Sequence, residues 1–318
     1  MKRIILSLFT LLVIGGAGFA QKRSKIVFSP QWTAQAQFAG YYVADSLGFY
    51  AEEGLDVTIK HPTKTASSLS RLAKGECDII TMHLMSALKA REEGLELVNV
   101  LQTSQQNALM VVSNTPLHGN PENLRGKTLG TWKVGFDELL RIMDKALNLN
   151  IQWIPFAGGV NLFISGAVDA QLVMNYNEFF QLKMAGLRID EDNLFYMSDI
   201  SGYNIPEDGL YVTTRYYKAH KAEVDKFVSA SRKGWQWCLD HQDEALGIVM
   251  EQVKRNNIGT NKVAQKWMLG TVLHMQEIKE TGERPFTLKE DVYLHTVKLM
   301  TDYGLLGKEA PEYKTFVK

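Results

Sequence analysis

The chain has 318 residues, 45% of them hydrophobic and 22% charged, and its 35 basic and 35 acidic side chains leave no formal net charge. This is the composition of a globular protein, and the balanced charge, without blocks of like sign, argues against nucleic acid or an anionic membrane as a partner. The sequence has no Cys-x-x-Cys and no Cys/His pair at ligand spacing, so it gives no support for a zinc site.

The first twenty residues have the pattern of a secretory signal peptide. Lys2 and Arg3 precede an apolar run over residues 4–19, and a small-x-small sequence ends at Ala20. These are a charged n-region, a short h-region and a cleavage site, whereas an uncleaved membrane anchor, the alternative, would need a longer apolar span. We therefore expect cleavage after about Ala20 and a periplasmic location for the mature chain.

Strand and helix patterns alternate from the start of the mature chain. The predicted strands are residues 25–29, 55–60, 77–82 and 95–103, and the predicted helices are 34–46, 67–75 and 86–94. Ser67 or Ser68 is placed to cap the second of these helices. The alternation indicates βαβ units around a mostly parallel sheet.

The middle of the chain repeats this pattern between two turn-rich stretches. A strand over 109–114 precedes the first stretch, 115–130, which we interpret as a crossing between two lobes. The next predicted elements are strands at 128–131, 151–155 and 170–174 and helices at 136–147 and 161–165. The loop 201–209, which leads into a strand at 210–214, is interpreted as the crossing back.

Two crossings predict two lobes, and the length of the mature chain exceeds the size at which a single core keeps growing. We assign residues 21–113 to the first part of lobe 1, 114–206 to lobe 2, and 207–318 to the hinge return and C-terminal helices, mainly on lobe 1. The expected fold class is α/β, with each lobe built on a mostly parallel sheet flanked by helices and the lobes joined by two hinge strands.

The C-terminal third is predicted to be helical. Residues 223–241 form one helix, and residues 287–300 form another that begins with a capping box of Thr287 and Glu290. An exported chain could pair Cys77 with Cys238, but we expect two free thiols, because the sequence alone does not establish the geometry of a disulfide.

Polar and aromatic residues follow several predicted strands, where ligands bind in open α/β sheets. No G-x-S-x-G, H-E-x-x-H or Walker A motif occurs, so we expect no catalytic residue, metal or cofactor. Flat aromatic faces with amide, hydroxyl and carboxylate groups suit a neutral or cationic planar heterocycle. The predicted ligand-binding residues are Trp32, Gln37, Tyr41, Thr65, Ser68, His83, Ser104, Trp132, Asn175, Glu178 and Asp208.

Several of these residues have a structural alternative. Ser68 could act only in helix capping, and His83 could be a half-buried histidine held by hydrogen bonds. Glu178 could be a solvated acid at a helix start, where negative charge is favourable. Tyr41 and Trp32 could belong to the core instead of a cleft.

The segment from Trp32 to Val57, WTAQAQFAGYYVADSLGFYAEEGLDV, closely resembles the opening of ABC-transporter solute-binding proteins of the thiamine-pyrimidine-precursor group. That group is related to the thiamine pyrimidine synthases and to sulfonate and nitrate binders. The resemblance spans nearly the whole mature chain and continues through LAKGECDIITMHLMSALKAREEGLELV, LRGKTLGTW, GAVDAQLVMNYNEFFQLKMAG and MSDISGYNIPEDGLYVTT.

The resemblance implies a periplasmic-binding-protein fold of the second topological type. It also implies capture of a small heterocycle, a formylaminopyrimidine or hydroxymethylpyrimidine, and its delivery to an ABC transporter permease by a monomeric protein. Trp32 matches an aromatic residue of the family, Tyr41 its cleft tyrosine and Gln37 its glutamine. Glu178 falls where the family's acid meets the pyrimidine.

The chain also departs from part of the wider family. The synthase branch carries a Cys-rich run and a His/Lys pair for iron and pyridoxal phosphate, whereas the residues after Glu178, FFQLKMAG, contain no cysteine. Together with the signal peptide, this argues against a synthase-like enzyme, which is the alternative from another class. Riboflavin, another small heterocycle or a sulfonate are the alternative ligands.

Overall fold

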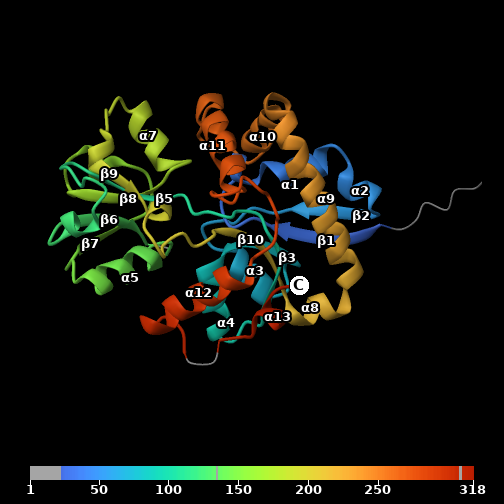
Figure 1. The fold of residues 1–318 in the computed structure, drawn as a ribbon. Helices are drawn as coiled ribbons and strands as arrows, with labels where there is room; N and C mark the ends of the chain where they lie inside the picture. Colours follow the sequence, from blue (N-terminus) through green and yellow to red (C-terminus); the bar gives the residue numbers. More distant parts are fainter. Residues whose placement is uncertain (1–22, 134, 308–309) are drawn as a thin grey trace, which may run out of the picture.

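The computed structural model describes residues 23–133, 135–307 and 310–318; the predicted signal peptide, residues 1–20, lies outside the described residues. The chain forms two five-stranded sheets, with the orders β2-β1-β3-β10-β4 and β7-β6-β8-β5-β9 (Figure 1). The first contains β1 (Ser24–Ser29), β2 (Leu55–Ile59), β3 (Ile79–His83), β4 (Leu97–Gln102) and β10 (Asp208–Thr213). The second contains β5 (Leu109–Ser113), β6 (Thr128–Trp132), β7 (Gln152–Phe156), β8 (Ala170–Met174) and β9 (Leu194–Tyr196).

Each sheet is parallel except for the strand that arrives from the other lobe. β1 pairs parallel with β2 and β3, and β6 pairs parallel with β7 and β8. β10 runs antiparallel to β3 and β4, and β5 runs antiparallel to β8 and β9. The predicted two-lobed fold with mostly parallel sheets is therefore confirmed.

The chain changes sheets twice, at residues 103–108 and 197–207. The return overlaps the predicted loop 201–209. The first crossing, expected at 115–130, was placed too late, because β5 pairs with β8 and β9 and so belongs to the second sheet. An apolar strand pattern predicts a buried strand but does not say which sheet it joins.

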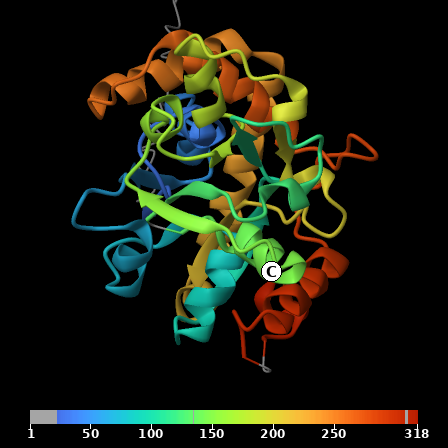
Figure 2. The same cartoon turned by 90° about the vertical axis from the view of Figure 1, so that its left-hand side faces the viewer.

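Helices cover both sheets. Those of the first lobe and its surroundings are α1 (Ala39–Ser46), α2 (Phe49–Glu52), α3 (Ser68–Ala73), α4 (Leu84–Glu92), α8 (Thr214–Ala219), α9 (Lys221–Asp240), α10 (Gln242–Arg255), α11 (Lys262–Met275), α12 (Glu290–Asp302) and α13 (Tyr313–Phe316). The second lobe carries α5 (Glu138–Leu147), α6 (Asn161–Ile164) and α7 (Glu178–Met184). Short 3-10 turns occur at η1 (Ala36–Phe38), η2 (Pro121–Leu124), η3 (Glu191–Asn193) and η4 (Met197–Asp199). Figures 1 and 2 show α10 and α11 at one end of the molecule and α12 at the opposite end.

The aromatic-rich helix α1 is a core element. It crosses α9 so closely that a Cβ added to Gly40 would lie 2.2 Å from the Trp235 ring. Its tyrosines, Tyr41 and Tyr42, are 1% and 0% exposed. The predicted helix 34–46 begins at residue 36 as the 3-10 turn η1 and continues as α1.

Of the two predicted helix caps, one is confirmed and the other is wrong. Ser67 caps α3 as predicted, since its hydroxyl accepts a hydrogen bond from the Ser70 backbone nitrogen at 3.1 Å. The predicted capping box is wrong, because α12 begins at Glu290 with Lys289 as its N-cap and without a side-chain cap. The Thr287 hydroxyl donates instead to the Pro285 carbonyl.

The two cysteines, Cys77 and Cys238, are buried and unpaired, as expected. Within residues 23–133, 135–307 and 310–318, no helix combines the length and apolarity needed to cross a membrane.

Candidate ligand-binding site

A narrow pocket lies where the carboxyl ends of strands from both sheets meet. Its walls come from the loop after β1, the end of β3, the segment after β6, and the β8–α7 connection. The lining residues are Gln31, Trp32, Gln35, Gln37, His83, Trp132, Phe136, Met174, Tyr176, Asn177 and Glu178. This is the position at which open α/β sheets bind ligands, so both lobes can touch a single bound molecule.

Three aromatic rings form one side of this pocket. Phe136, from the second lobe, lies between the two indoles, with ring centroids 6.1 Å from Trp32 and 6.4 Å from Trp132 in edge-to-face geometry. It also contacts the His83 ring at 4.6 Å. The aromatic wall therefore joins the lobes, because Trp32 and His83 belong to the first lobe.

Glu178, the first residue of α7, supplies a buried carboxylate from the second lobe. Its Oε2 accepts from the Met174 backbone nitrogen at 3.1 Å, and its Oε1 accepts from Asn177 Nδ2 at 3.2 Å. Burial raises the pKa of this carboxyl, and hydrogen bonds from the backbone and from the Trp132 and Asn177 side chains oppose that rise. Oxygens held in this way can accept a further hydrogen bond from an amine or ring N–H of a ligand.

A glutamine network forms the facing wall in the first lobe. Asp208 Oδ1 accepts from Gln31 Nε2 at 2.6 Å, and Asp208 Oδ2 accepts from Gln37 Nε2 at 2.8 Å. Gln35 Nε2 donates in turn to the side-chain oxygen Oε1 of Gln37 at 2.6 Å. These amides fix the polar groups that face the pocket, and Asp208 lies behind them at the start of β10.

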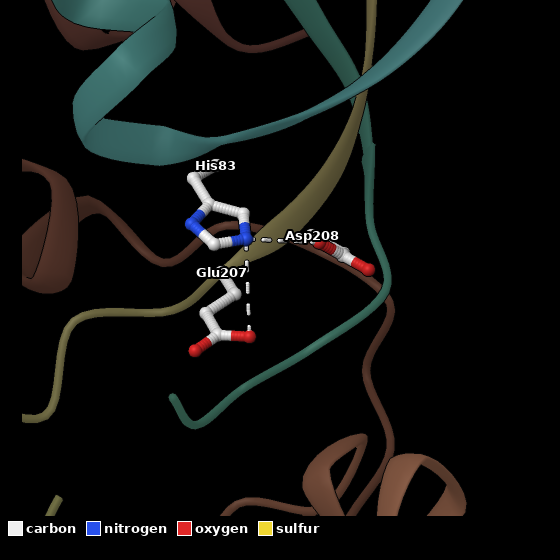
Figure 3. Close-up of side chains that lie close together, drawn as sticks. All are labelled: His83, Glu207 and Asp208. Carbon is white, nitrogen blue, oxygen red and sulfur yellow. Dashed lines mark ion pairs between the residues drawn. The ribbon is translucent and has the colours of Figure 1, made fainter. Parts of the chain in front are cut away.

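Beside this network, His83, Glu207 and Asp208 form a buried cluster (Figure 3). The His83 Nε2 atom lies 3.5 Å from Asp208 Oδ1 and 3.9 Å from Glu207 Oε2. Burial lowers the pKa of His83 to about 3 and raises that of Asp208 to about 6. Burial and the neighbouring Asp208 raise the pKa of Glu207 far above its usual range.

At neutral pH this cluster therefore has a neutral His83 and a charged Asp208, and burial favours the neutral form of Glu207. In the described part of the chain it is the group that brings three metal-ligating side chains within 4.8 Å. Both Asp208 oxygens already accept hydrogen bonds from glutamine amides, so a single negative charge is satisfied there without a cation.

Five of the predicted residues line the pocket: Trp32, Gln37, His83, Trp132 and Glu178. Asp208 supports it through Gln31 and Gln37. The structure places the other predicted residues outside its lining.

The other five predicted residues lie elsewhere in the fold. Tyr41 lies between the Phe28 and Trp235 rings in the core, and Thr65 is exposed on a loop. The Ser68 hydroxyl donates to the Pro30 carbonyl at 2.5 Å. The Ser104 backbone donates to the Asp208 carbonyl, and the Asn175 carbonyl accepts from the Trp267 indole.

Six residues that line the pocket were not among the predicted ligand-binding residues: Gln31, Gln35, Phe136, Met174, Tyr176 and Asn177. Glu207, in the buried cluster with His83, was not predicted either. Phe136 falls inside the predicted helix 136–147, but α5 begins only at Glu138. Its positive φ of 72° places it in a turn, which a hydrophobic pattern does not reveal.

Comparison with known proteins identifies the family of the chain. A family model described as NMT1/THI5 like matches residues 35–245, more than half of the chain. The chain belongs to the NMT1/THI5-like family. Among relatives of this NMT1/THI5-like protein, the formylaminopyrimidine-binding protein of Halalkalibacterium halodurans is 24% identical over 257 residues, covering 77% of this chain and 76% of that one.

Two further similarities are to proteins named for other ligands. The riboflavin-binding protein RibY of Chloroflexus aurantiacus is 27% identical over 248 residues, covering 74% of this chain and 68% of that one. The solved structure of the periplasmic aliphatic sulphonate binding protein SsuA from Escherichia coli superposes with a TM-score of 0.67 at 13% identity, covering 93% of this chain and 92% of that one. The NMT1/THI5-like chain thus has the fold of ABC-type periplasmic binding proteins.

Proposed function

We propose that this protein is the periplasmic substrate-binding component of an ABC importer and that it captures a pyrimidine precursor of thiamine, of the formylaminopyrimidine or hydroxymethylpyrimidine type. The observation that carries the proposal is the pocket between the lobes, where aromatic rings stand beside the buried carboxylate of Glu178. The relative that binds formylaminopyrimidine supports the same ligand class.

In this account the pyrimidine lies against the indoles of Trp32 and Trp132. Stacking on large aromatic rings favours a flat heterocycle. Glu178 accepts a hydrogen bond from the exocyclic amine or a ring N–H, and this contact selects an aminopyrimidine over an apolar ring.

Binding would act through the relative position of the lobes. The lobes already meet at α11 and α7, where the Trp267 indole donates to the Asn175 carbonyl at 3.0 Å and stacks on Phe180 at 5.0 Å. A ligand that touches both lobes stabilises this arrangement, and a permease partner recognises it. The function is therefore conformational, and the proposal assigns no catalytic residue.

The charges at the pocket argue against a sulfonate. Among the described residues that line it, none is Lys or Arg, and Glu178 is an acid. A sulfonate needs hydrogen-bond donors or cations to offset its charge when it is buried, so a neutral or cationic ligand fits these walls better.

A thermal-shift screen of the purified protein tests the proposal. The panel contains formylaminopyrimidine, 4-amino-5-hydroxymethyl-2-methylpyrimidine, thiamine, riboflavin, alkanesulfonates and polyamines. Because a ligand that binds only the native state raises the melting temperature, we expect the largest shift with an aminopyrimidine. A shift with riboflavin or a sulfonate and none with either pyrimidine would contradict the proposed ligand, and a Schiff-base absorbance or stoichiometric iron would indicate the enzyme instead.

A further inference from the structure

A second pocket, with room for about one water-sized group, lies behind the aromatic wall of the first. The side chains of His83 and Phe136 line both pockets and thus form the partition between them. The far walls of the second pocket come from the starts of α4 and α5 and from both crossing segments, through Asn107, Ile205 and Glu207.

Two polar atoms of this second pocket have no hydrogen-bond partner among the described residues. Glu207 Oε2 and Asn107 Oδ1 are both buried and unpartnered. The other polar atoms of the same side chains are satisfied, since Glu207 Oε1 accepts from the Ala108 nitrogen at 2.7 Å and Asn107 Nδ2 donates to the Tyr203 carbonyl at 2.8 Å. Leaving such atoms unpaired destabilises the protein, so a group that hydrogen-bonds to them would gain affinity.

The chemistry of these atoms defines what would fit. Asn107 Oδ1 is an acceptor and needs a donor. Burial and the neighbouring Asp208 raise the pKa of Glu207, which favours the neutral carboxyl, and Oε2 of a neutral carboxyl can take part in a hydrogen bond as donor or acceptor. Among the described lining residues none is Lys or Arg, and Glu138 adds another acid. An uncharged group that both donates and accepts, such as a hydroxyl or a formamide, is complementary, whereas a phosphate is not.

Phe136 is placed so that it can open this partition. It lies between β6 and α5 and belongs to neither element. Its φ of 72° is in the left-handed region, which a bulky residue adopts only when its surroundings hold it there. Contacts with the rings of Trp32, Trp132 and His83 keep Phe136 in this conformation. A ligand ring that replaces those contacts would allow Phe136 to leave it.

We propose that the second pocket is a subsite for an uncharged hydroxyl- or formamide-bearing arm of the ligand, and that Phe136 is the gate through which this arm enters. The inference rests on the proposed function, because it assumes that the ring of the ligand occupies the first pocket.

Calorimetry with two ligands tests the subsite. 4-Amino-5-hydroxymethyl-2-methylpyrimidine carries the arm, and 4-amino-2,5-dimethylpyrimidine lacks its hydroxyl. The native protein should prefer the first by about tenfold, the effect of one well-placed hydrogen bond. Ser86→Phe fills the second pocket from the start of α4 and should reduce the preference to less than about threefold, while the affinity for the dimethyl compound stays unchanged. Ser165→Phe, at an exposed position of the second lobe, is the matched control.

Stopped-flow tryptophan fluorescence tests the gate, because Trp32 and Trp132 flank Phe136. Phe136→Ala should speed association of the hydroxymethyl compound several-fold, and Phe136→Leu repeats the test if the alanine variant is unstable. An unchanged rate, or a preference that survives Ser86→Phe, would overturn the inference. If the native protein binds both pyrimidines equally well, only the inference fails; if it binds neither, the proposed function fails and the inference with it.

Discussion

The carboxylate of Glu178 is the group whose removal should be most costly to ligand binding. It is 5% exposed and accepts hydrogen bonds from the Met174 nitrogen and Asn177 Nδ2. In Glu178→Gln the single remaining oxygen is required by the Met174 N–H, so the new amide NH₂ takes the place of Oε1, which accepts from Asn177 Nδ2 and, in the proposed complex, from the ligand. A donor on the pyrimidine then loses its acceptor and meets another donor.

The expected loss follows from the strength of hydrogen bonds to charged groups, about 1.5–3 kcal/mol when they are buried. At about 1.4 kcal/mol for each factor of ten, the dissociation constant should rise roughly 10- to 150-fold. Isothermal titration of the native protein and the variant with formylaminopyrimidine at pH 7.5 measures this. Glu191→Gln, an identical change at an exposed site of the same lobe, should have no effect. A Glu178→Gln variant that is folded and binds within threefold of the native affinity would remove Glu178 from the site.

Three further outcomes follow from the same geometry. Trp32→Ala should weaken pyrimidine binding about tenfold or more, since stacking contributes about 0.5–1.5 kcal/mol beyond the lost buried area; titration calorimetry with an unchanged affinity would exclude this indole. Burial raises the pKa of Asp208 to about 6, so the native protein loses stability as pH rises from about 4 to about 6 and the carboxyl ionises. Because both Asp208 oxygens accept from glutamine amides, Asp208→Asn also loses a hydrogen bond at every pH. The melting temperature of the native protein relative to this variant should therefore fall between pH 4 and pH 6.5, and a difference that stays constant over this range would contradict the assignment. Trp267→Leu removes the stack on Phe180 and should shift the unliganded protein toward open conformations, seen as a larger radius of gyration in small-angle scattering that the pyrimidine restores; an unchanged radius would show that this contact does not hold the lobes together.

Much of the fold could be predicted from the sequence because alternating strand and helix patterns identify βαβ units directly. The position of the first crossing could not be, since β5 is a short apolar strand that could pair with either sheet. Its partners, β8 and β9, follow much later in the chain, and no local pattern encodes pairing over such separations.

The site was predictable only in part, for a similar reason. Trp132 ends a strand and Glu178 begins the helix that follows another strand. The sequence reveals both positions, and ligands bind at the carboxyl ends of strands in such sheets. Tyr41 is also an aromatic residue that follows a predicted strand, but it packs against Trp235 in the core. It does so because Gly40 and Gly234 let α1 and α9 approach closely. The role of Phe136 depends on a positive φ and on contacts with both lobes, which are properties of the folded chain.

A crystal structure of the protein with formylaminopyrimidine bound tests the central claim most directly. The account predicts the ring between the lobes, against the indoles of Trp32 and Trp132, with an exocyclic or ring nitrogen within hydrogen-bond distance of a Glu178 oxygen. Density for the ligand at any other place on the protein, or in this pocket with Glu178 turned away from it, would contradict the account.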